Sequence, residues 1–82
     1  MENQNKDKDI KYTVNDKEQE TDQKVMTPRA ILEKAGIDPT LNYLVQIEGK
    51  KQISYKDSPD QNIEMHNNMK FISISTGPTP VS

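Results

Sequence analysis

The side chains that could do chemistry are few, and their spacing does not bring them together. His66 is the single histidine and cysteine is absent, which removes thiolate catalysis and sulfur-ligated metal sites. A zinc site or a serine triad needs more partners than one histidine offers, so we interpret His66 as a solvated loop residue. Asp57 and Asp60 flank Ser58-Pro59, and we interpret both carboxylates as turn formers.

No motif for nucleotide or cofactor chemistry accompanies these residues. The sequence contains no P-loop, no glycine-rich dinucleotide turn and no nucleophile elbow. We therefore expect no cofactor and no metal, and we expect that the protein is not an enzyme. Among the classes of function, we therefore expect a binding protein or a carrier protein.

Length and charge narrow the choice of partner. The 82 residues are enough for one domain. With 11 Lys and Arg against 13 Asp and Glu, the net charge is −2, which favours neither nucleic acid nor an anionic membrane as a partner. No apolar run approaches the ~20 residues of a membrane helix, and the charged start is unlike a signal peptide. We expect a cytoplasmic monomer that acts through other proteins.

The apolar residues are concentrated in one window. Ile, Leu, Val and Phe total 16, and fifteen of them lie from Ile10 to Ile74. We predict one domain over residues 9–76, because this window holds nearly everything that can be buried. Segments 1–8 and 77–82 are predicted to be a disordered amino-terminal tail and a flexible carboxyl-terminal tail.

The first elements are predicted to be a hairpin. Apolar and polar residues alternate over 9–14, which is typical of a half-buried strand. Asn15-Asp16 is a turn signal, and the polar stretch 17–25 is predicted to return as a second, exposed edge strand.

A short helix is predicted over residues 28–35. Thr27 can cap its first turn, Pro28 suits its first position and Gly36 can end it. A helix of this length is stable only when it packs against something else, so we expect it to lie on a sheet.

Three further strands are predicted after the helix. They cover residues 43–47, 52–55 and 70–75, and the last of these is apolar on both faces. Ile63 and Met65 lie in the loop before the last of these strands, and their side chains are expected to pack against the core.

This order of elements predicts an α+β domain in which one mixed sheet of four to five strands covers one helix. The final strand fits the middle of the sheet, beside the first strand, because both of its faces can be buried. Such an arrangement is typical of the ubiquitin-like β-grasp fold.

The sequence also resembles the bacterial ubiquitin-like proteins of the multiubiquitin type, which are encoded beside activating, conjugating and JAB-type peptidase proteins. The segments that carry the resemblance are Tyr12–Lys17, Thr27–Pro39, Asn42–Val45 and Lys70–Ile74. The resemblance implies a protein modifier without catalytic residues. Its implied partners are an activating-type enzyme, a conjugating-type enzyme, a JAB-type peptidase and a target protein.

The resemblance implies that Gly77 and Pro78 are the conjugation and processing site. Ubiquitin ends in Gly-Gly, whereas here a single glycine is followed by five more residues, so cleavage after Gly77 would be needed. A terminal glycine suits the narrow channels through which such carboxylates pass, because it has no side chain.

Two alternatives stand beside the modifier. A glycine followed by a proline, as at Gly77 and Pro78, also commonly marks a turn. If that is its only role, the protein is a non-conjugated β-grasp binding module with an inert tail. A sulfur carrier is a weaker candidate, because such carriers usually present a free Gly-Gly end.

Ubiquitin-like domains usually offer the sheet face away from the helix to their partners. Because Val45 and Ile72 suit the core, we predict that Leu44 and Phe71 are exposed and contact partners. Ile53, at the same part of the sheet as Phe71, is the third predicted contact. The alternative is that Leu44 and Phe71 are buried at the rim of the sheet.

Overall fold

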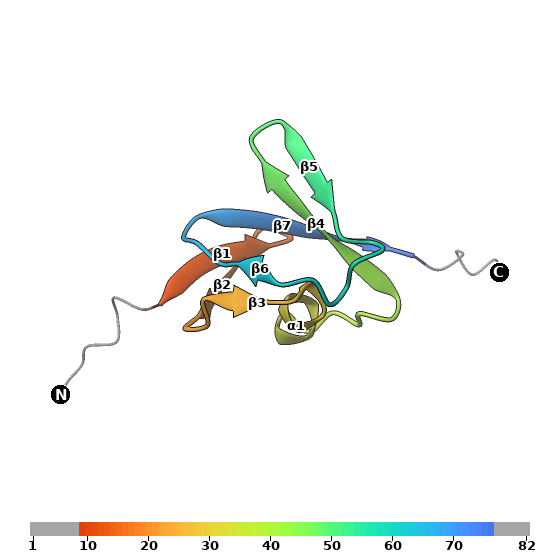
Figure 1. The fold of residues 1–82 in the computed structure, drawn as a ribbon, viewed down its shortest axis with the longest axis horizontal. Helices are drawn as coiled ribbons and strands as arrows, with labels where there is room; N and C mark the ends of the chain where they lie inside the picture. The colour runs from red at the N-terminus through yellow and green to blue at the C-terminus, as the bar shows by residue number, and fades with distance from the viewer. Residues whose placement is uncertain (1–8, 77–82) are drawn as a thin grey trace.

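The computed structural model describes residues 9–76, so the predictions made for segments 1–8 and 77–82 lie outside the described residues. Seven strands and one helix make up this part of the chain (Figure 1). They are β1 (Ile10–Val14), β2 (Lys17–Thr21), β3 (Val25–Met26), α1 (Pro28–Lys34), β4 (Asn42–Glu48), β5 (Lys51–Ser54), β6 (Ile63–Glu64) and β7 (Met69–Ser75).

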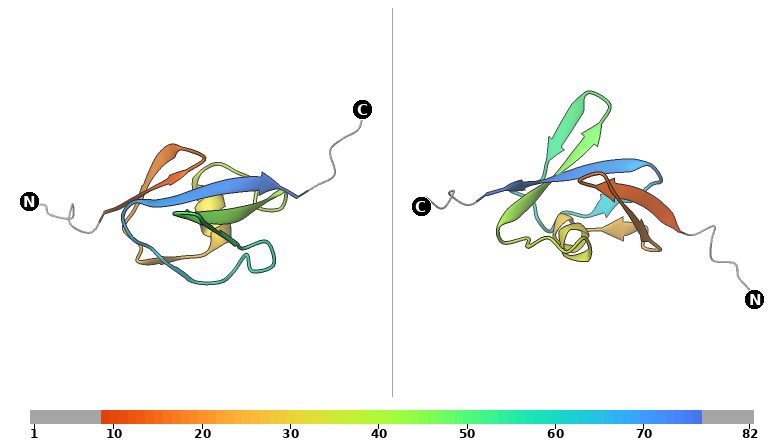
Figure 2. Two further views of the ribbon diagram at one scale, coloured as in Figure 1. Left: turned by 90° about the horizontal axis from the view of Figure 1, so that it is seen from above. Right: turned by 180° about the vertical axis from the view of Figure 1, so that it is seen from behind.

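Five of the strands form one mixed sheet with the order β2-β1-β7-β4-β5. β7 runs parallel to β1 and antiparallel to β4, and the two outer pairs, β1–β2 and β4–β5, are antiparallel hairpins. α1 and the small β3–β6 sheet lie on one side of this sheet (Figure 2). The predicted α+β class and the central place of the last strand are confirmed.

The β1–β2 hairpin is closed by Asn15 and Asp16, both at positive φ (53° and 67°), as a two-residue turn of this kind requires. The Asn15 side chain also ties the turn to β7. Its Nδ2 donates to Ser73 Oγ and its Oδ1 accepts from Ser73 N, each at 2.9 Å. The backbone N–H of Asn15 donates to the carbonyl of Phe71 at 2.9 Å, so the turn extends the β1–β7 pairing.

The second strand is shorter than the predicted stretch 17–25. β2 ends at Thr21, whose Oγ1 accepts from the backbone N–H of Gln23 at 3.1 Å. This side-chain bond turns the chain out of the sheet. The residues after this turn form β3, which pairs with β6 instead of β1.

The helix begins and ends where its signals predicted. Thr27 has extended backbone angles, and its Oγ1 accepts from the N–H of Ala30 at 3.1 Å. At the other end Gly36 has a φ of +79°, and the N–H of Ile37 reaches the carbonyl of Leu32 at 2.9 Å, as in a Schellman motif. Within residues 9–76 no helix has the length and apolar character needed to cross a membrane.

The core lies between the sheet and the layer formed by α1, β3 and β6. The rings of Tyr12 and Phe71 meet edge to face at its centre, with centroids 5.9 Å apart. Ile63 and Met65 are buried as predicted. The cluster consists of Tyr12, Val14, Met26, Ile31, Leu32, Leu44, Tyr55, Ile63, Met65 and Phe71.

Candidate functional site

Leu44 and Phe71 are not exposed, which corrects the prediction that they form a surface for partners. Both side chains are fully buried in the cluster beneath the helix. Ile53 is partly buried and packs against the same cluster. These three residues therefore support the fold, and the alternative interpretation of Leu44 and Phe71 as buried residues is the one that holds.

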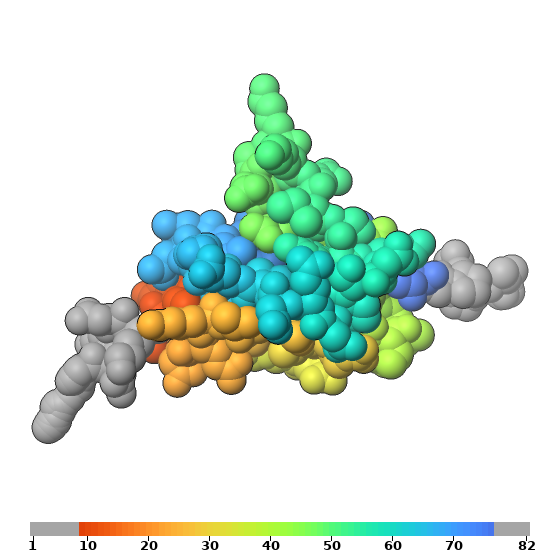
Figure 3. All heavy atoms as spheres, in the orientation of Figure 1, coloured from red at the N-terminus to blue at the C-terminus, as the bar shows by residue number. Residues whose placement is uncertain are grey.

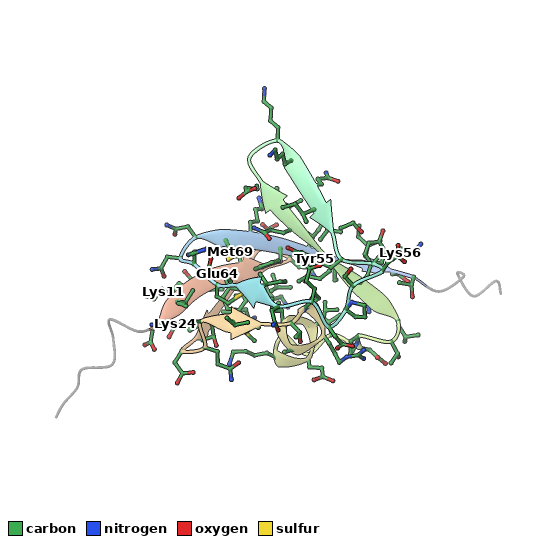
Figure 4. All side chains as sticks on the ribbon, in the orientation of Figure 1. Lys11, Lys24, Tyr55, Lys56, Glu64 and Met69 are labelled. Atoms are coloured by element: carbon green, nitrogen blue, oxygen red, sulfur yellow. The ribbon has the colours of Figure 1, made fainter. Side chains whose placement is uncertain are left out.

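A buried hydrogen bond explains the reversal. Leu44 shares its face of β4 with Gln46, a polar residue of a type that is mostly exposed in proteins. Gln46 is nevertheless 8% exposed, because its Oε1 accepts from the hydroxyl of Tyr55 at 3.1 Å. Figure 4 shows Tyr55 at the base of the β4–β5 hairpin. A glutamine that finds such a partner can lie in a core at little cost.

The opposite face of the sheet carries an apolar patch that α1 does not cover. Residues opposite each other in a register project from the same face. Val45 lies opposite Ile72, and Tyr43 lies opposite Ile74. None of these side chains belongs to the core cluster. The open-face patch, as we call it, consists of Tyr43, Val45, Ile47, Ile72 and Ile74.

The open-face patch has an apolar centre and lysines at its rim. Val45 is 3% exposed between its neighbours, whereas Ile74 is 36% exposed. The Nζ of Lys56 lies 5.7 Å from the centre of the Tyr43 ring, a distance at which a cation and an aromatic face attract. Lys70 lies opposite Ile47 and is exposed. Such a surface suits a partner with apolar and acidic side chains.

The end of β7 brings the last described residues next to this patch. The N–H of Thr76 donates to the carbonyl of Leu41 at 2.8 Å, so the backbone is held to the body of the domain up to that residue. Leu41 is 55% exposed. Gly77 and Pro78, the predicted processing site, come next and lie outside the described residues. Phe71 and Ile53 are not at this end of the sheet, since β7 runs ~13 Å from Phe71 to Ser75.

The titratable side chains that the structure describes in ion pairs lie at separate places on the surface. Glu64 Oε1 lies 3.6 Å from His66 Nε2, with both side chains exposed. Asp60 pairs with Arg29, at 3.0 Å between Nε and Oδ1, and this hydrogen bond lowers the pKa of the Asp60 carboxyl. Asp60 therefore also ties its loop to the helix. Among residues 9–76 there is no group of three metal-ligating side chains.

Comparison with known proteins adds no relative: no protein-family model, no curated protein and no solved structure matches the chain. The candidate site rests on the geometry of the described residues alone. Val45 and Ile72 were predicted to share the face of the sheet that packs on the core. Which face they share was wrong, and Leu41 was missed because its exposure depends on where the chain crosses the end of β7.

Proposed function

We propose that the protein is a β-grasp, ubiquitin-like modifier that is cleaved after Gly77, activated at the new carboxylate and joined to target proteins. In this proposal the open-face patch is the surface that partner proteins bind. The partners are an activating-type enzyme, a conjugating-type enzyme, a JAB-type peptidase and the target.

The order of the elements supports the β-grasp assignment. A hairpin, a crossing helix, a second hairpin and a central last strand parallel to the first follow one another along the chain. A single sheet then grasps the helix on one face and leaves the other face to partners.

The observation that carries the proposal is the position at which β7 ends. β7 lies in the middle of the sheet and leaves it at Thr76, on the side of the molecule opposite the start of β1 (Figure 1). The next residue is Gly77. Because the backbone is held at Thr76, a cut after Gly77 would leave a carboxylate one residue beyond the body of the domain. An enzyme acting on that carboxylate would have to contact Leu41 and the open-face patch beside it.

The proposed chemistry uses enzymes other than this chain. Hydrolysis of the Gly77–Pro78 peptide bond consumes water and leaves a glycine carboxylate and a free proline amine. The carboxylate then attacks the α-phosphate of ATP, releasing pyrophosphate, and a cysteine thiolate of the activating-type enzyme displaces AMP. An amine or other nucleophile of the target finally displaces the thiolate. The chain itself supplies a terminal residue without a side chain and a surface that positions it.

The test is the intact mass of the protein from the cells that make it, followed by reaction with the activating and conjugating proteins. We expect loss of residues 78–82 and a thioester that disappears under reducing conditions. Gly77→Val should abolish the thioester, because its side chain fills the channel, while Thr79→Val should form it normally because residue 79 is removed. Equal adduct formation by Gly77→Val, or conjugation through Ser82, would contradict the proposal.

The second candidate is a non-conjugated binding module, and the open-face patch favours it equally. Ile74→Asp would place a charge in the patch at an exposed position and should weaken partner binding in either case. The two candidates differ in the tail: a binding module keeps residues 78–82 and binds equally well with Gly77→Val.

A further inference from the structure

We propose that the two outer strands of the sheet bind each other between copies of this chain, so that the protein assembles head to tail into an extended sheet. This interaction does not depend on the proposed modification, and it replaces the monomer expected from composition. We call β2 with its flanking Asp16 and Asp22 the acidic edge. We call β5 with its flanking Lys50 and Lys56 the basic edge.

The topology leaves each edge with one strand neighbour among residues 9–76. In the order β2-β1-β7-β4-β5, β2 pairs only with β1 and β5 pairs only with β4. β1, β7 and β5 run in one direction and β2 and β4 in the other, so β2 and β5 run in opposite directions. A second copy that is rotated to follow the twist of the sheet can therefore place its β2 antiparallel to β5 of the first, with the two helices on the same face of the continued sheet (Figure 1).

The backbone of the basic edge has groups pointing outward at two residues. Along a strand of an antiparallel pair, the backbone N–H and C=O groups of one residue bond to the partner strand, and those of the next residue point away from it. The N–H of Tyr55 donates to Leu44 at 2.9 Å, so Ile53, two residues earlier, also points toward β4. Gln52 and Ser54 consequently present their N–H and C=O groups at the free edge.

The backbone of the acidic edge has outward groups at the matching spacing. The two-residue turn before Lys17 makes that residue a bonded partner in the β1–β2 pair, and Gln19 has the same orientation. Glu18 and Glu20 therefore point their backbone groups away from β1. Both side chains are exposed, and both project from the face that carries the open-face patch.

One register satisfies the backbone and the charges together. Ser54 would lie opposite Glu18 of the next copy and Gln52 opposite its Glu20, so all the outward backbone groups find partners. Beyond the two strands, the turns bring Lys56 near Asp16 and Lys50 near Asp22, and Asp16 also lies 3.9 Å from Lys70 of its own chain. In this register Glu18 is diagonal to Lys56, and Glu20 is diagonal to Lys50, within reach of long side chains.

The two edges carry opposite charge. Residues 16–22 contain four carboxylates and one lysine, a net charge of −3, and residues 50–56 contain three lysines and no carboxylate, a net charge of +3. Charges on edge strands usually prevent pairing with other chains. Here they would repel an acidic edge from a second acidic edge and a basic edge from a second basic edge. The remaining contact joins unlike edges, and such a contact does not close at two copies.

The shape of the molecule leaves the basic edge accessible. The β4–β5 hairpin projects from the body of the domain (Figure 3). Its turn, at Gly49 and Lys50, lies at the tip of this projection and is exposed. A second copy could therefore approach β5 along its whole length without meeting α1.

Sedimentation of the full chain tests the proposal. At about 20 mM salt, where charges interact over about 20 Å, we expect the average mass to rise with concentration from 9.4 kDa past that of a dimer. At about 0.5 M salt the association should weaken at least about tenfold. A mass that stays at the monomer up to about 1 mM, or that stops at a dimer, would overturn the proposal.

Charge reversal identifies the surfaces. Glu18→Lys/Glu20→Lys should lower the association constant at least about tenfold, since two attractive pairs become repulsive. The control Glu33→Lys/Glu64→Lys makes the same change of charge at exposed positions away from both edges and should leave association unchanged. Equal loss with the control would show a general charge effect and refute the edge contact.

Mixing two variants separates this contact from other kinds of association. Lys50→Glu/Lys56→Glu should also fail to associate alone, but it retains an intact acidic edge, and Glu18→Lys/Glu20→Lys retains an intact basic edge. An equimolar mixture should therefore regain association. A mixture that stays monomeric, when circular dichroism shows both variants folded, would refute the proposal.

A last variant tests pairing through the backbone. Gln52→Pro removes an N–H that points outward, which an edge strand tolerates, and should weaken association at least about tenfold. Gln52→Thr keeps the N–H and should associate like the parent. Full association of folded Gln52→Pro would rule out strand pairing as the mode of contact.

Discussion

Replacing Leu44 or Ile74 with alanine measures which face of the sheet is the core. The two residues lie on neighbouring strands and project from opposite faces. Leu44 is 0% exposed and Ile74 is 36% exposed. Losing three buried carbons from Leu44 removes ~2.4 kcal/mol of transfer free energy at ~0.8 kcal/mol each, and the cavity raises the cost to ~2.7–5 kcal/mol. Ile74→Ala should cost ~1.5 kcal/mol, because about a third of this residue is already in water and its removal leaves no closed cavity.

The consequence for the whole domain is large. At ~0.1 kcal/mol per residue, the part over 9–76 has a free energy of unfolding of ~7 kcal/mol. Leu44→Ala should therefore lower the melting temperature by at least ~10 °C. Urea unfolding followed by far-UV circular dichroism gives the change in free energy from the midpoints, provided that the slopes agree. A loss with Ile74→Ala equal to or larger than that with Leu44→Ala would refute our assignment of the two faces.

Three other outcomes are expected from single contacts. Asn15→Ala should lower the free energy of unfolding by ~1–3 kcal/mol in urea titration, because two bonds to Ser73 and a residue suited to positive φ are lost. Tyr12→Phe should leave the melting temperature equal or higher, since the buried Tyr12 hydroxyl has no hydrogen-bond partner among residues 9–76; a clear decrease would contradict this. The pKa of Asp60 is lowered from 3.8 by its hydrogen bond to Arg29, so the stability from this pair is present above pH 3.8 and is lost as the pH falls through the lower, folded value. Arg29→Gln should reduce that acid-dependent loss in a pH series of melting curves.

The elements that were predicted correctly are those whose signals are local. Thr27 and Gly36 mark the ends of the helix through bonds that span three to five residues, so the sequence nearby contains all the information needed. The Asn15-Asp16 turn is of the same kind. The central position of β7 was also predictable. A strand that is apolar on both faces is favoured in the middle of a sheet, where it has a neighbouring strand on each side.

The facing of β4 and β7 could not be predicted in the same way. Alternation shows that Tyr43, Val45 and Ile47 share a face, but it does not show which face meets the helix. That choice depends on the packing of the whole core, in which the polar Gln46 lies buried with its side chain bonded to the Tyr55 hydroxyl. The early end of β2 is marked by a local bond from the Gln23 N–H to Thr21 Oγ1, a signal that was missed. The partner of β3 lies some forty residues further along the chain, and this contact arises only once the chain has folded.

The two proposed interactions use different parts of the sheet and can occur together. The open-face patch lies on β4 and β7, toward the middle of the sheet, whereas the head-to-tail contact uses the outer edges of β2 and β5. Continuing the sheet from copy to copy would leave every patch uncovered and on the same face of the twisted sheet. β7 lies between the two outer pairs of strands and Thr76 is held to Leu41, so a neighbour beside β5 or β2 would not cover Thr76. Partner proteins would then meet a row of identical patches, and a partner with two binding modules would bind such a row more tightly than a single copy.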